Sequence, residues 1–222
     1  MTGGVSQEDA GDLVHVSVNG EAVEANLSIP AGAEGIVLFA HGTGSSRHSS
    51  RNNFVADDLR DGGLATLLID LLTEEEKEID RRTRRVRFDI ERLANRVTGA
   101  TDWLLEQEET EHLNVGIFGS STGAAGALIA AARRPEAVVA VVSRGGRVDL
   151  AEAVFGQVQA PALFIVGGDD VQVRELNRQA LRQMEGDHEM EVVPGAGHLF
   201  EGAGELEQVA GLARDWFQHH LT

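Results

Sequence analysis

The chain contains no cysteine among its 222 residues. It therefore forms no disulfide bond and offers neither a thiolate metal ligand nor a cysteine nucleophile. It also lacks an apolar run approaching the roughly 18 residues that span a membrane, and its first residues are acidic and polar, unlike a signal peptide. These absences favour a cytoplasmic protein with no membrane partner.

Positive charge is scarce as well. Against 36 acidic residues stand 19 lysines and arginines, which gives a formal net charge of −17 at pH 7. A field of this sign opposes binding to nucleic acid and to anionic membranes, so we expect neither as a partner.

One basic run, residues 81–87, departs from this trend. It directly follows an acidic run, and the acid comes first in two i,i+4 pairs, Glu78–Arg82 and Asp80–Arg84. This order is the favourable one on a helix. We interpret the run as a self-paired helix face rather than a phosphate-binding patch.

The pattern of apolar residues predicts one α/β domain over residues 1–222, with 1–11 as a loose lead-in. Alternating apolar residues over 14–18 and 23–29, on either side of Asn19-Gly20, predict an antiparallel hairpin. The apolar runs that follow are almost continuous, as in strands buried on both faces of a parallel sheet. We expect such strands at 36–40, 64–69, 115–118, 137–142 and 162–166, and a last strand at 188–193.

Helical patterns lie between these strands, which predicts right-handed crossovers and helices on both faces of the sheet. The longest helix is expected to begin near Thr73, because Thr73 and Glu76 have the spacing of a capping box. It is expected to continue through an apolar stripe from Ile90 to Leu104. The other helices are expected at 53–60, 124–132, 171–184 and 205–219.

The pentapeptide 119–123 (GSSTG) has the form G-x-S-x-G and stands between an apolar strand and a helix of small residues. Strand, tight turn and helix form a nucleophile elbow, in which glycines two positions either side of the serine let neighbouring backbone pass close by. Such a turn exposes the hydroxyl of Ser121 at a helix N-terminus, where negative charge is stabilised. An ordinary turn is the alternative, but this setting favours a nucleophile.

A serine hydroxyl needs a base, and the base needs an orienting carboxylate. In chains with an elbow of this kind, the carboxylate comes after the serine in the sequence, and the histidine comes after the carboxylate. Asp169 and Asp170 come after the strand at 162–166, at the edge where α/β sites assemble. His198 lies in a glycine-rich loop before the last helix. We assign His198 as the base and favour Asp170 over Asp169 as the acid, although Asp170 could also simply cap the next helix.

An acyl-transfer intermediate also needs hydrogen-bond donors for its oxyanion. The first expected donor is the backbone N–H of Thr122, the residue after the nucleophile. The second is expected from the glycine-rich loop 41–48, where we assign it to Thr43 with Gly42 as the alternative. His41 is interpreted as a loop-shaping residue and not as a second base.

Candidates for substrate contacts are Gly42, Arg47 and His48 in this loop and Arg144 after a buried strand, with Arg51 and Arg147 near the same entrance. Arginine suits a substrate carboxylate through paired hydrogen bonds, but each of these residues could equally be a surface charge or a loop anchor. No metal site is expected, because the chain has no H-E-x-x-H motif.

With elbow, acid, histidine and His-Gly loop in place, the chain resembles the α/β-hydrolase superfamily, in particular its small, lidless dienelactone-hydrolase-like branch. Residues 41–48, 119–123, 164–170 and 194–200 carry the resemblance, which extends from the hairpin to the terminal helix. It implies a mostly parallel eight-stranded sheet with an N-terminal antiparallel hairpin, no large cap domain, hydrolase activity and no cofactor. Dienelactone hydrolases proper carry cysteine at the elbow, whereas this chain carries serine, which favours a serine carboxylesterase.

The sequence thus predicts a serine hydrolase of the carboxylesterase type (EC 3.1.1.-) that acts on small, short-acyl esters through Ser121, His198, Asp170 and a covalent acyl-enzyme. Acyl transfer to an alcohol, amine or peroxide by the same residues, as in an acyltransferase or perhydrolase, is one alternative. A non-catalytic binding protein of the same fold is the other. The expected partner is a small-molecule ester, and the chain is expected to be a monomer or a homodimer.

Overall fold

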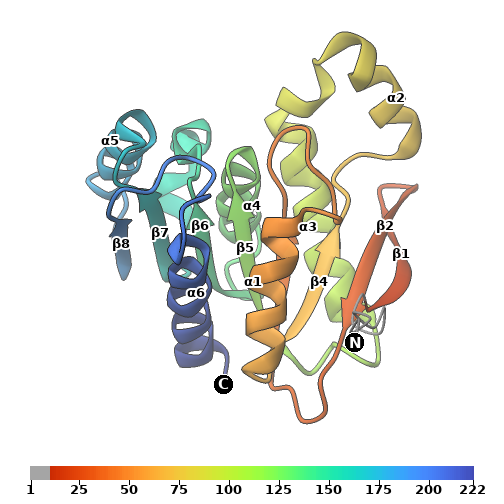
Figure 1. The fold of residues 1–222 in the computed structure, drawn as a ribbon. Coiled ribbons are helices and arrows are strands. Elements are labelled where there is room, and N and C mark those ends of the chain that lie inside the picture. The colour runs from red at the N-terminus through yellow and green to blue at the C-terminus, as the bar shows by residue number, and fades with distance from the viewer. Residues whose placement is uncertain (1–10) are drawn as a thin grey trace, which may run out of the picture.

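The structure is a computed structural model and describes residues 11–222, so the predicted lead-in lies outside the described residues except for Gly11. Eight strands form one sheet in the order β1-β2-β4-β3-β5-β6-β7-β8 (Figure 1). The strands are β1 (Asp12–Val18), β2 (Glu21–Ser28), β3 (Gly35–Ala40), β4 (Ala65–Ile69), β5 (Asn114–Ser120), β6 (Val138–Arg144), β7 (Ala162–Gly167) and β8 (His188–Val193). From β4 to β8 across the sheet every pairing is parallel.

The predicted N-terminal hairpin is confirmed. Strands β1 and β2 pair antiparallel, and β2 also pairs antiparallel with β4. Asn19 and Gly20 join the two strands with φ angles of 53° and 83°. Two successive positive φ angles define the turn whose twist matches that of a hairpin, and Asn-Gly is its preferred sequence.

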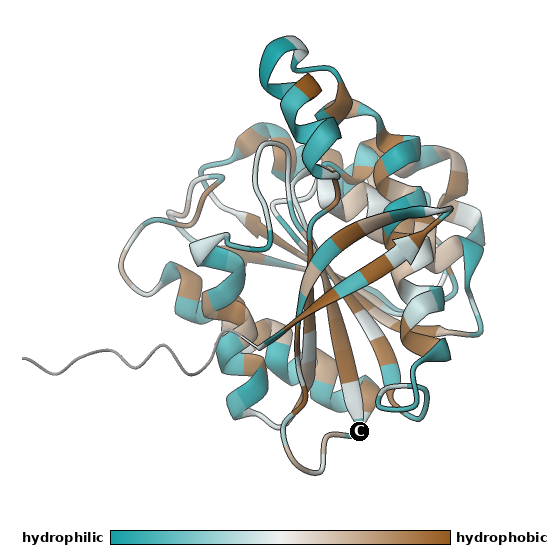
Figure 2. Ribbon diagram, turned by 90° about the vertical axis from the view of Figure 1, so that its right-hand side faces the viewer, coloured by the Kyte–Doolittle hydropathy of each residue, from teal (hydrophilic) through white to brown (hydrophobic). Residues whose placement is uncertain are grey.

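Helices cover both faces of the sheet, as predicted. The helices α1 (Ser50–Asp61) and α6 (Glu205–Leu221) pack on one face, where Val37 and Phe39 of β3 join their core. On the other face, Ile36 and Leu38 pack against α3 (Ile90–Glu106) and α4 (Thr122–Arg133). The 3-10 helix η2 (Val148–Gln157) and α5 (Val171–Leu181) extend this second layer. Figure 2 shows the apolar strands running between these layers.

The prediction of one long helix from Thr73 was wrong, although its capping box is confirmed. Helix α2 (Glu74–Thr83) ends at Arg84, which has the left-handed φ of 54°. A short 3-10 helix, η1 (Val86–Phe88), then leads into α3. The predicted Asp80–Arg84 pair is also wrong, because Asp80 accepts hydrogen bonds from the backbone N–H and Nε of Arg87 instead.

The predicted Glu78–Arg82 ion pair is confirmed at 2.7 Å. Helix α2 projects beyond the carboxyl edge of the sheet (Figures 1 and 2). No large cap domain is present in the described part of the chain. Among residues 11–222, no helix is both long and apolar enough to cross a membrane.

Candidate active site

The order of the strands reverses at β3. The chain passes from β3 outward to β4 and then returns to the other side of β3 as β5. At such a switch point the loops after the two central strands diverge, and ligands of open α/β sheets bind in the crevice between them. Here those loops are residues 41–49 after β3 and the turn at Ser121 after β5.

Ser121 has the backbone geometry of a nucleophile elbow. Its φ of 50° and ψ of −121° are strained for a residue with a side chain, and it is the N-terminal cap residue of α4. The glycines around it permit the tight turn. A Cβ atom on Gly123 would lie 2.2 Å from the Ala40 carbonyl oxygen, and one on Gly119 would lie 2.5 Å from the Cα of Ala124.

The structure brings His198 and Asp170 together although 28 residues separate them. His198 Nδ1 lies 2.7 Å from Asp170 Oδ2, and Asp170 Oδ1 accepts the backbone N–H of Val173 at 3.4 Å. Asp170 therefore caps α5 and also contacts the histidine. Asp169 is exposed and contacts the histidine loop through its backbone, by a hydrogen bond from its N–H to the Ala196 carbonyl. This geometry favours Asp170 over Asp169 as the orienting acid.

The end of β6 lies next to both Ser121 and His198. The N–H of Ser121 donates to the Arg144 carbonyl at 3.1 Å. A Cβ atom on Gly145 would lie 3.5 Å from Nδ1 of His198, so the imidazole packs against this backbone. No hydrogen bond joins Ser121 to His198 within residues 11–222, where the imidazole contacts Asp170.

Thr43 and Thr122, the two expected oxyanion donors, are in direct contact. Their Oγ1 atoms are 2.7 Å apart, and Thr43 Oγ1 also donates to the Arg87 carbonyl at 3.5 Å. Thr122 is the first residue of α4, so its N–H has no acceptor within the helix. Gly42 packs directly on the nucleophile: a Cβ atom there would lie 2.9 Å from Ser121 Cβ. The hydroxyl contact was not predicted, because nothing in the spacing of Thr43 and Thr122 indicates it.

His41 is a buried structural residue, as interpreted from the sequence. Its Nε2 accepts the backbone N–H of Leu71 at 3.0 Å, so Nδ1 carries the proton and donates to the Gly42 carbonyl at 2.9 Å. Burial lowers the pKa of His41 below its ordinary value, which keeps the ring neutral. Both ring nitrogens are thus occupied in shaping the loop.

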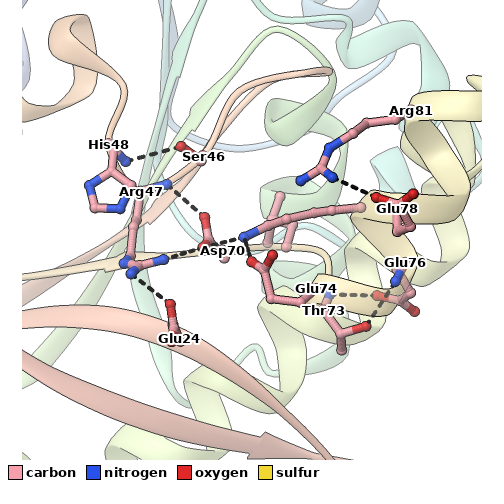
Figure 3. A network of polar contacts seen from close by, with 12 residues as sticks. Glu24, Ser46, Arg47, His48, Asp70, Thr73, Glu74, Glu76, Glu78 and Arg81 are labelled. Atoms are coloured by element: carbon pink, nitrogen blue, oxygen red, sulfur yellow. Dashed lines mark hydrogen bonds and ion pairs between the residues drawn. The ribbon is translucent and has the colours of Figure 1, made fainter.

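A pocket of about 500 Å³ opens beside this loop. Gly42, Thr43, Arg47 and His48 line it on one side, and residues of α2 line it on the other. Ser121 packs against Gly42 but is not itself among the lining residues. Arg47 is engaged in ion pairs with the buried carboxylate of Asp70 and with Glu24 (Figure 3). Its guanidinium therefore anchors the loop, while the side chain of His48 is exposed at the rim.

The carboxylate of Asp70 holds this side of the pocket together. It accepts hydrogen bonds from the backbone N–H of Arg47 at 2.8 Å and from Lys77 Nζ at 2.8 Å. Burial alone would raise the pKa of Asp70, but the bonds from Lys77 and Arg47 outweigh it, and the net pKa lies below the ordinary value. Asp70 thus fastens α2 and the loop after β3 to the end of β4.

Arg144 is buried, with 8% of its surface exposed. Its Nη1 is shut off from solvent and has no hydrogen-bond partner, and the guanidinium forms no ion pair within residues 11–222. Burial, and secondly the nearby positive charge of Arg51, lower the pKa of Arg144 to about 10. Among residues 11–222, no cluster of three or more His, Asp or Glu side chains is arranged to hold a metal ion.

Comparisons with known proteins agree with this architecture. The sequence profile of the dienelactone hydrolase family matches residues 23–219. A dienelactone hydrolase of known structure from Anabaena variabilis is 57% identical, with a TM-score of 0.94 over 95% of this chain and 98% of that one. Est1E from Butyrivibrio proteoclasticus, solved with ferulic acid bound, has a TM-score of 0.79 over 93% of this chain and 98% of its own. At 14% identity, that likeness concerns the fold alone.

A curated protein of Mycobacterium tuberculosis, which carries the provisional name phosphoribosyl transferase, is 55% identical over 199 residues. The match covers 90% of this chain and 44% of that protein. This chain therefore spans less than half of the length of that relative.

Proposed function

This chain belongs to the dienelactone hydrolase family of α/β hydrolases, and from that premise we propose that it hydrolyses small, short-acyl carboxylic esters with Ser121 as nucleophile. The main support for the proposal is the 2.7 Å hydrogen bond between His198 Nδ1 and Asp170 Oδ2. It lies at the same sheet edge as the strained turn of Ser121. A histidine oriented by a carboxylate is what a serine hydroxyl needs in order to attack.

In the first step Ser121 Oγ attacks the ester carbonyl carbon and transfers its proton to Nε2 of His198. This nitrogen is available because Nδ1–H donates to Asp170. The tetrahedral intermediate collapses when the carbon–oxygen bond to the leaving alcohol breaks, and the alkoxide takes the proton from His198. The backbone N–H groups of Thr43 and Thr122 would hold the oxyanion; loss of one such donor typically costs about 3–4 kcal/mol in the barrier.

In the second step a water molecule attacks the acyl-enzyme, with His198 again as the base. The acid leaves when the bond to Ser121 Oγ breaks and the serine recovers its proton. An alcohol, amine or peroxide in place of water would give acyl transfer by the same route. Product analysis with an added alcohol distinguishes the two outcomes, because hydrolysis yields only the free acid.

Short acyl chains are expected because the described part of the chain has no large cap domain over the sheet edge, and the pocket between α2 and the loop after β3 measures about 500 Å³. Gly42, Arg47 and His48 lie along this pocket, the arginine as a loop anchor. The test is hydrolysis of p-nitrophenyl esters of increasing chain length. Highest kcat/KM for acetate to butyrate supports the proposal, and a preference for long chains contradicts it.

The name of the Mycobacterium tuberculosis relative describes a protein of which only 44% is matched here. We therefore do not propose phosphoribosyl transfer for this chain. We propose that it acts on a free small-molecule ester in the cytoplasm.

A further inference from the structure

Asn177 of α5 is a fully buried polar side chain. Its Nδ2 donates hydrogen bonds to the carbonyl oxygens of Gly146 and Val173, at 2.8 Å each. Because both acceptors are carbonyl oxygens, only the NH2 end of the amide fits here. Asn177 therefore joins α5 to the turn 144–147, which begins at the end of β6 and lies beside Ser121.

One peptide group connects this hydrogen bond to the nucleophile. The carbonyl of Gly146 and the N–H of Arg147 belong to the same peptide, and residues 11–222 contain no cis peptide bond. In a planar trans peptide the N–H points away from the carbonyl. Here the Arg147 N–H donates to the carbonyl of Ser121 at 3.0 Å. Asn177 thus binds one end of a peptide group whose other end binds the backbone of Ser121.

A second peptide group extends this connection toward the oxyanion. The carbonyl of Ser121 shares its peptide with the N–H of Thr122, the first donor expected for the oxyanion. Such an N–H is effective only if it points at the position where the charge develops. The bond from Arg147 fixes the plane of this peptide, together with a 3.2 Å bond from the Ala124 N–H to the same carbonyl. Because hydrogen bonds in a chain polarise one another, the amide of Asn177 also strengthens the bond from Arg147.

Backbone hydrogen bonds hold the first half of the turn. The Arg144 carbonyl accepts the N–H of Ser121 at 3.1 Å, and the Gly145 N–H donates to the Ile165 carbonyl of β7 at 2.8 Å. Bonds of this kind do not depend on the residue type. The bond from Asn177 to the second half does, so a substitution can remove it.

The same amide also contacts the first turn of α5, which carries the acid. Val173, whose carbonyl accepts from Asn177, donates its N–H to Asp170 Oδ1 at 3.4 Å. The other oxygen of Asp170 contacts His198. Asn177 therefore links the turn that supports the nucleophile to the helix turn that supports the acid.

We propose that Asn177 is a positioning residue of the oxyanion hole. Through the peptide of Gly146 and Arg147 it orients the Thr122 N–H toward the oxygen on which negative charge develops. The inference rests on the proposed esterase function and adds to it a residue that does not touch the substrate. An asparagine that only satisfied a buried carbonyl would stabilise the fold and leave the transition state unaffected. The tests therefore compare catalysis with stability.

The first test measures kcat and KM for p-nitrophenyl butyrate in Asn177→Leu, which keeps a similar volume and removes the donor. Complete loss of an oxyanion donor lowers kcat by about 10²–10³-fold. Here the Thr122 N–H stays and is only displaced. We therefore expect kcat to fall about tenfold and KM to stay within about twofold, as for an interaction made in the transition state.

Asn177→Ser keeps the proposal testable if Asn177→Leu does not fold. A serine hydroxyl on a helix bonds the carbonyl four residues back, which here is that of Val173. Its side chain is one atom shorter than that of asparagine, so the bond to Gly146 is lost. Asn177→Ser is expected to lower kcat as much as Asn177→Leu does, while losing less stability.

Thr110→Val is the matched control. It removes another fully buried donor, because Thr110 Oγ1 donates to the Leu104 carbonyl at 2.6 Å. Thr110 lies shortly before β5, at the opposite edge of the sheet from Ser121. Thr110→Val is expected to lower the unfolding temperature and to keep kcat within about twofold. Unchanged kcat in folded Asn177→Leu or Asn177→Ser, or an equal fall of kcat in Thr110→Val, overturns the proposal.

The second test does not depend on hydrolysis and follows the backbone amide proton of Arg147 by NMR in the full chain. In Asn177→Leu this proton is expected to shift upfield and to exchange faster with solvent, because its bond to the Ser121 carbonyl weakens. The amide proton of Gly145, which donates to Ile165, is expected to shift less. An unchanged Arg147 proton overturns the proposal. If the proton shifts but the wild-type chain hydrolyses no ester, the link from Asn177 to Ser121 stands and the esterase proposal fails.

Discussion

The carboxylate of Asp170 contacts His198 with one oxygen and the first turn of α5 with the other. Oδ2 lies 2.7 Å from His198 Nδ1, and Oδ1 accepts the backbone N–H of Val173 at 3.4 Å. Helix α5 therefore holds the carboxylate of Asp170 in position, and this carboxylate in turn orients the imidazole of His198. Two roles that appear as alternatives in the sequence, helix cap and triad acid, are compatible in one side chain.

The substitution Asp170→Asn separates these two roles. Asparagine caps helices as well as aspartate does, so the free energy of unfolding should change little. It cannot stabilise the imidazolium that forms during attack, and kcat should fall by about 10³–10⁴-fold. Asp170→Ala should show the same loss of activity and an additional loss of about 1 kcal/mol in the free energy of unfolding. Esterase assays and urea denaturation measure both effects.

Asp169→Asn is the matched control, since Asp169 is the exposed neighbour of Asp170. It should retain activity within about twofold and lose little stability, as expected of an exposed surface position. Full activity in Asp170→Asn, or inactivity in Asp169→Asn, would show that the acid is assigned to the wrong residue.

The strain at Ser121 predicts a stabilising substitution. Its φ of 50° is unfavourable for any residue with a Cβ atom and tolerated by glycine. Ser121→Gly should therefore unfold at higher urea concentration than Ser121→Ala, by about 1 kcal/mol in free energy, while both are inactive. Equal stability of the two variants would argue against stored strain at the elbow.

The hydroxyl contact between Thr43 and Thr122 predicts coupled effects on catalysis. Thr43→Val and Thr122→Val should each lower kcat about tenfold with little change in KM, since the 2.7 Å contact positions donors that act in the transition state. Because both variants break the same contact, the double variant should be less impaired than the product of the two effects. Thr43→Ser keeps the hydroxyl and should retain most activity. Multiplicative effects would exclude a shared role.

The lowered pKa of His41 leads us to expect a loss of stability in mild acid. Burial lowers its pKa in the folded chain below the ordinary 6.5, so below pH 6.5 the unfolded chain binds more protons than the folded one. The free energy of unfolding should therefore decrease as pH falls from 6.5 through the folded pKa of His41. His188 and His220, whose pKa values burial also lowers, add to this slope.

The measurement is the slope of unfolding free energy against pH between 7 and 5. His41→Gln should lower the stability at pH 7 and also make the slope shallower, because one titrating group is removed. An unchanged slope would mean that His41 is protonated as readily in the folded chain as in the unfolded one.

The sequence predicted the features that depend on local pattern. The alternation of apolar residues around Asn19-Gly20 predicted the hairpin. The continuous apolar runs predicted the parallel strands, with boundaries that agree with the structure to within a few residues. The elbow at Ser121 and the order of Asp170 and His198 follow from residues near the ends of those strands. Such signals are local because periodicity and turn chemistry act over a few residues.

Features that depend on distant partners could not be predicted. Helix α2 ends at Arg84, and Asp80 binds Arg87 across the break instead of pairing at i,i+4 within the helix. Arg47 is a loop anchor because Asp70, 23 residues away, is buried beside it. Arg144 resembles any strand-terminal arginine in the sequence, and only the fold leaves it buried without a partner.

The proposed hydrolysis requires Ser121 to be an activated nucleophile. The direct measurement is the intact mass of the protein after treatment with a fluorophosphonate, followed by identification of the labelled peptide. We predict one adduct per chain, on Ser121, and none on Ser121→Ala. A folded wild-type chain that stays unlabelled, or a Ser121→Ala variant that labels equally, would contradict it.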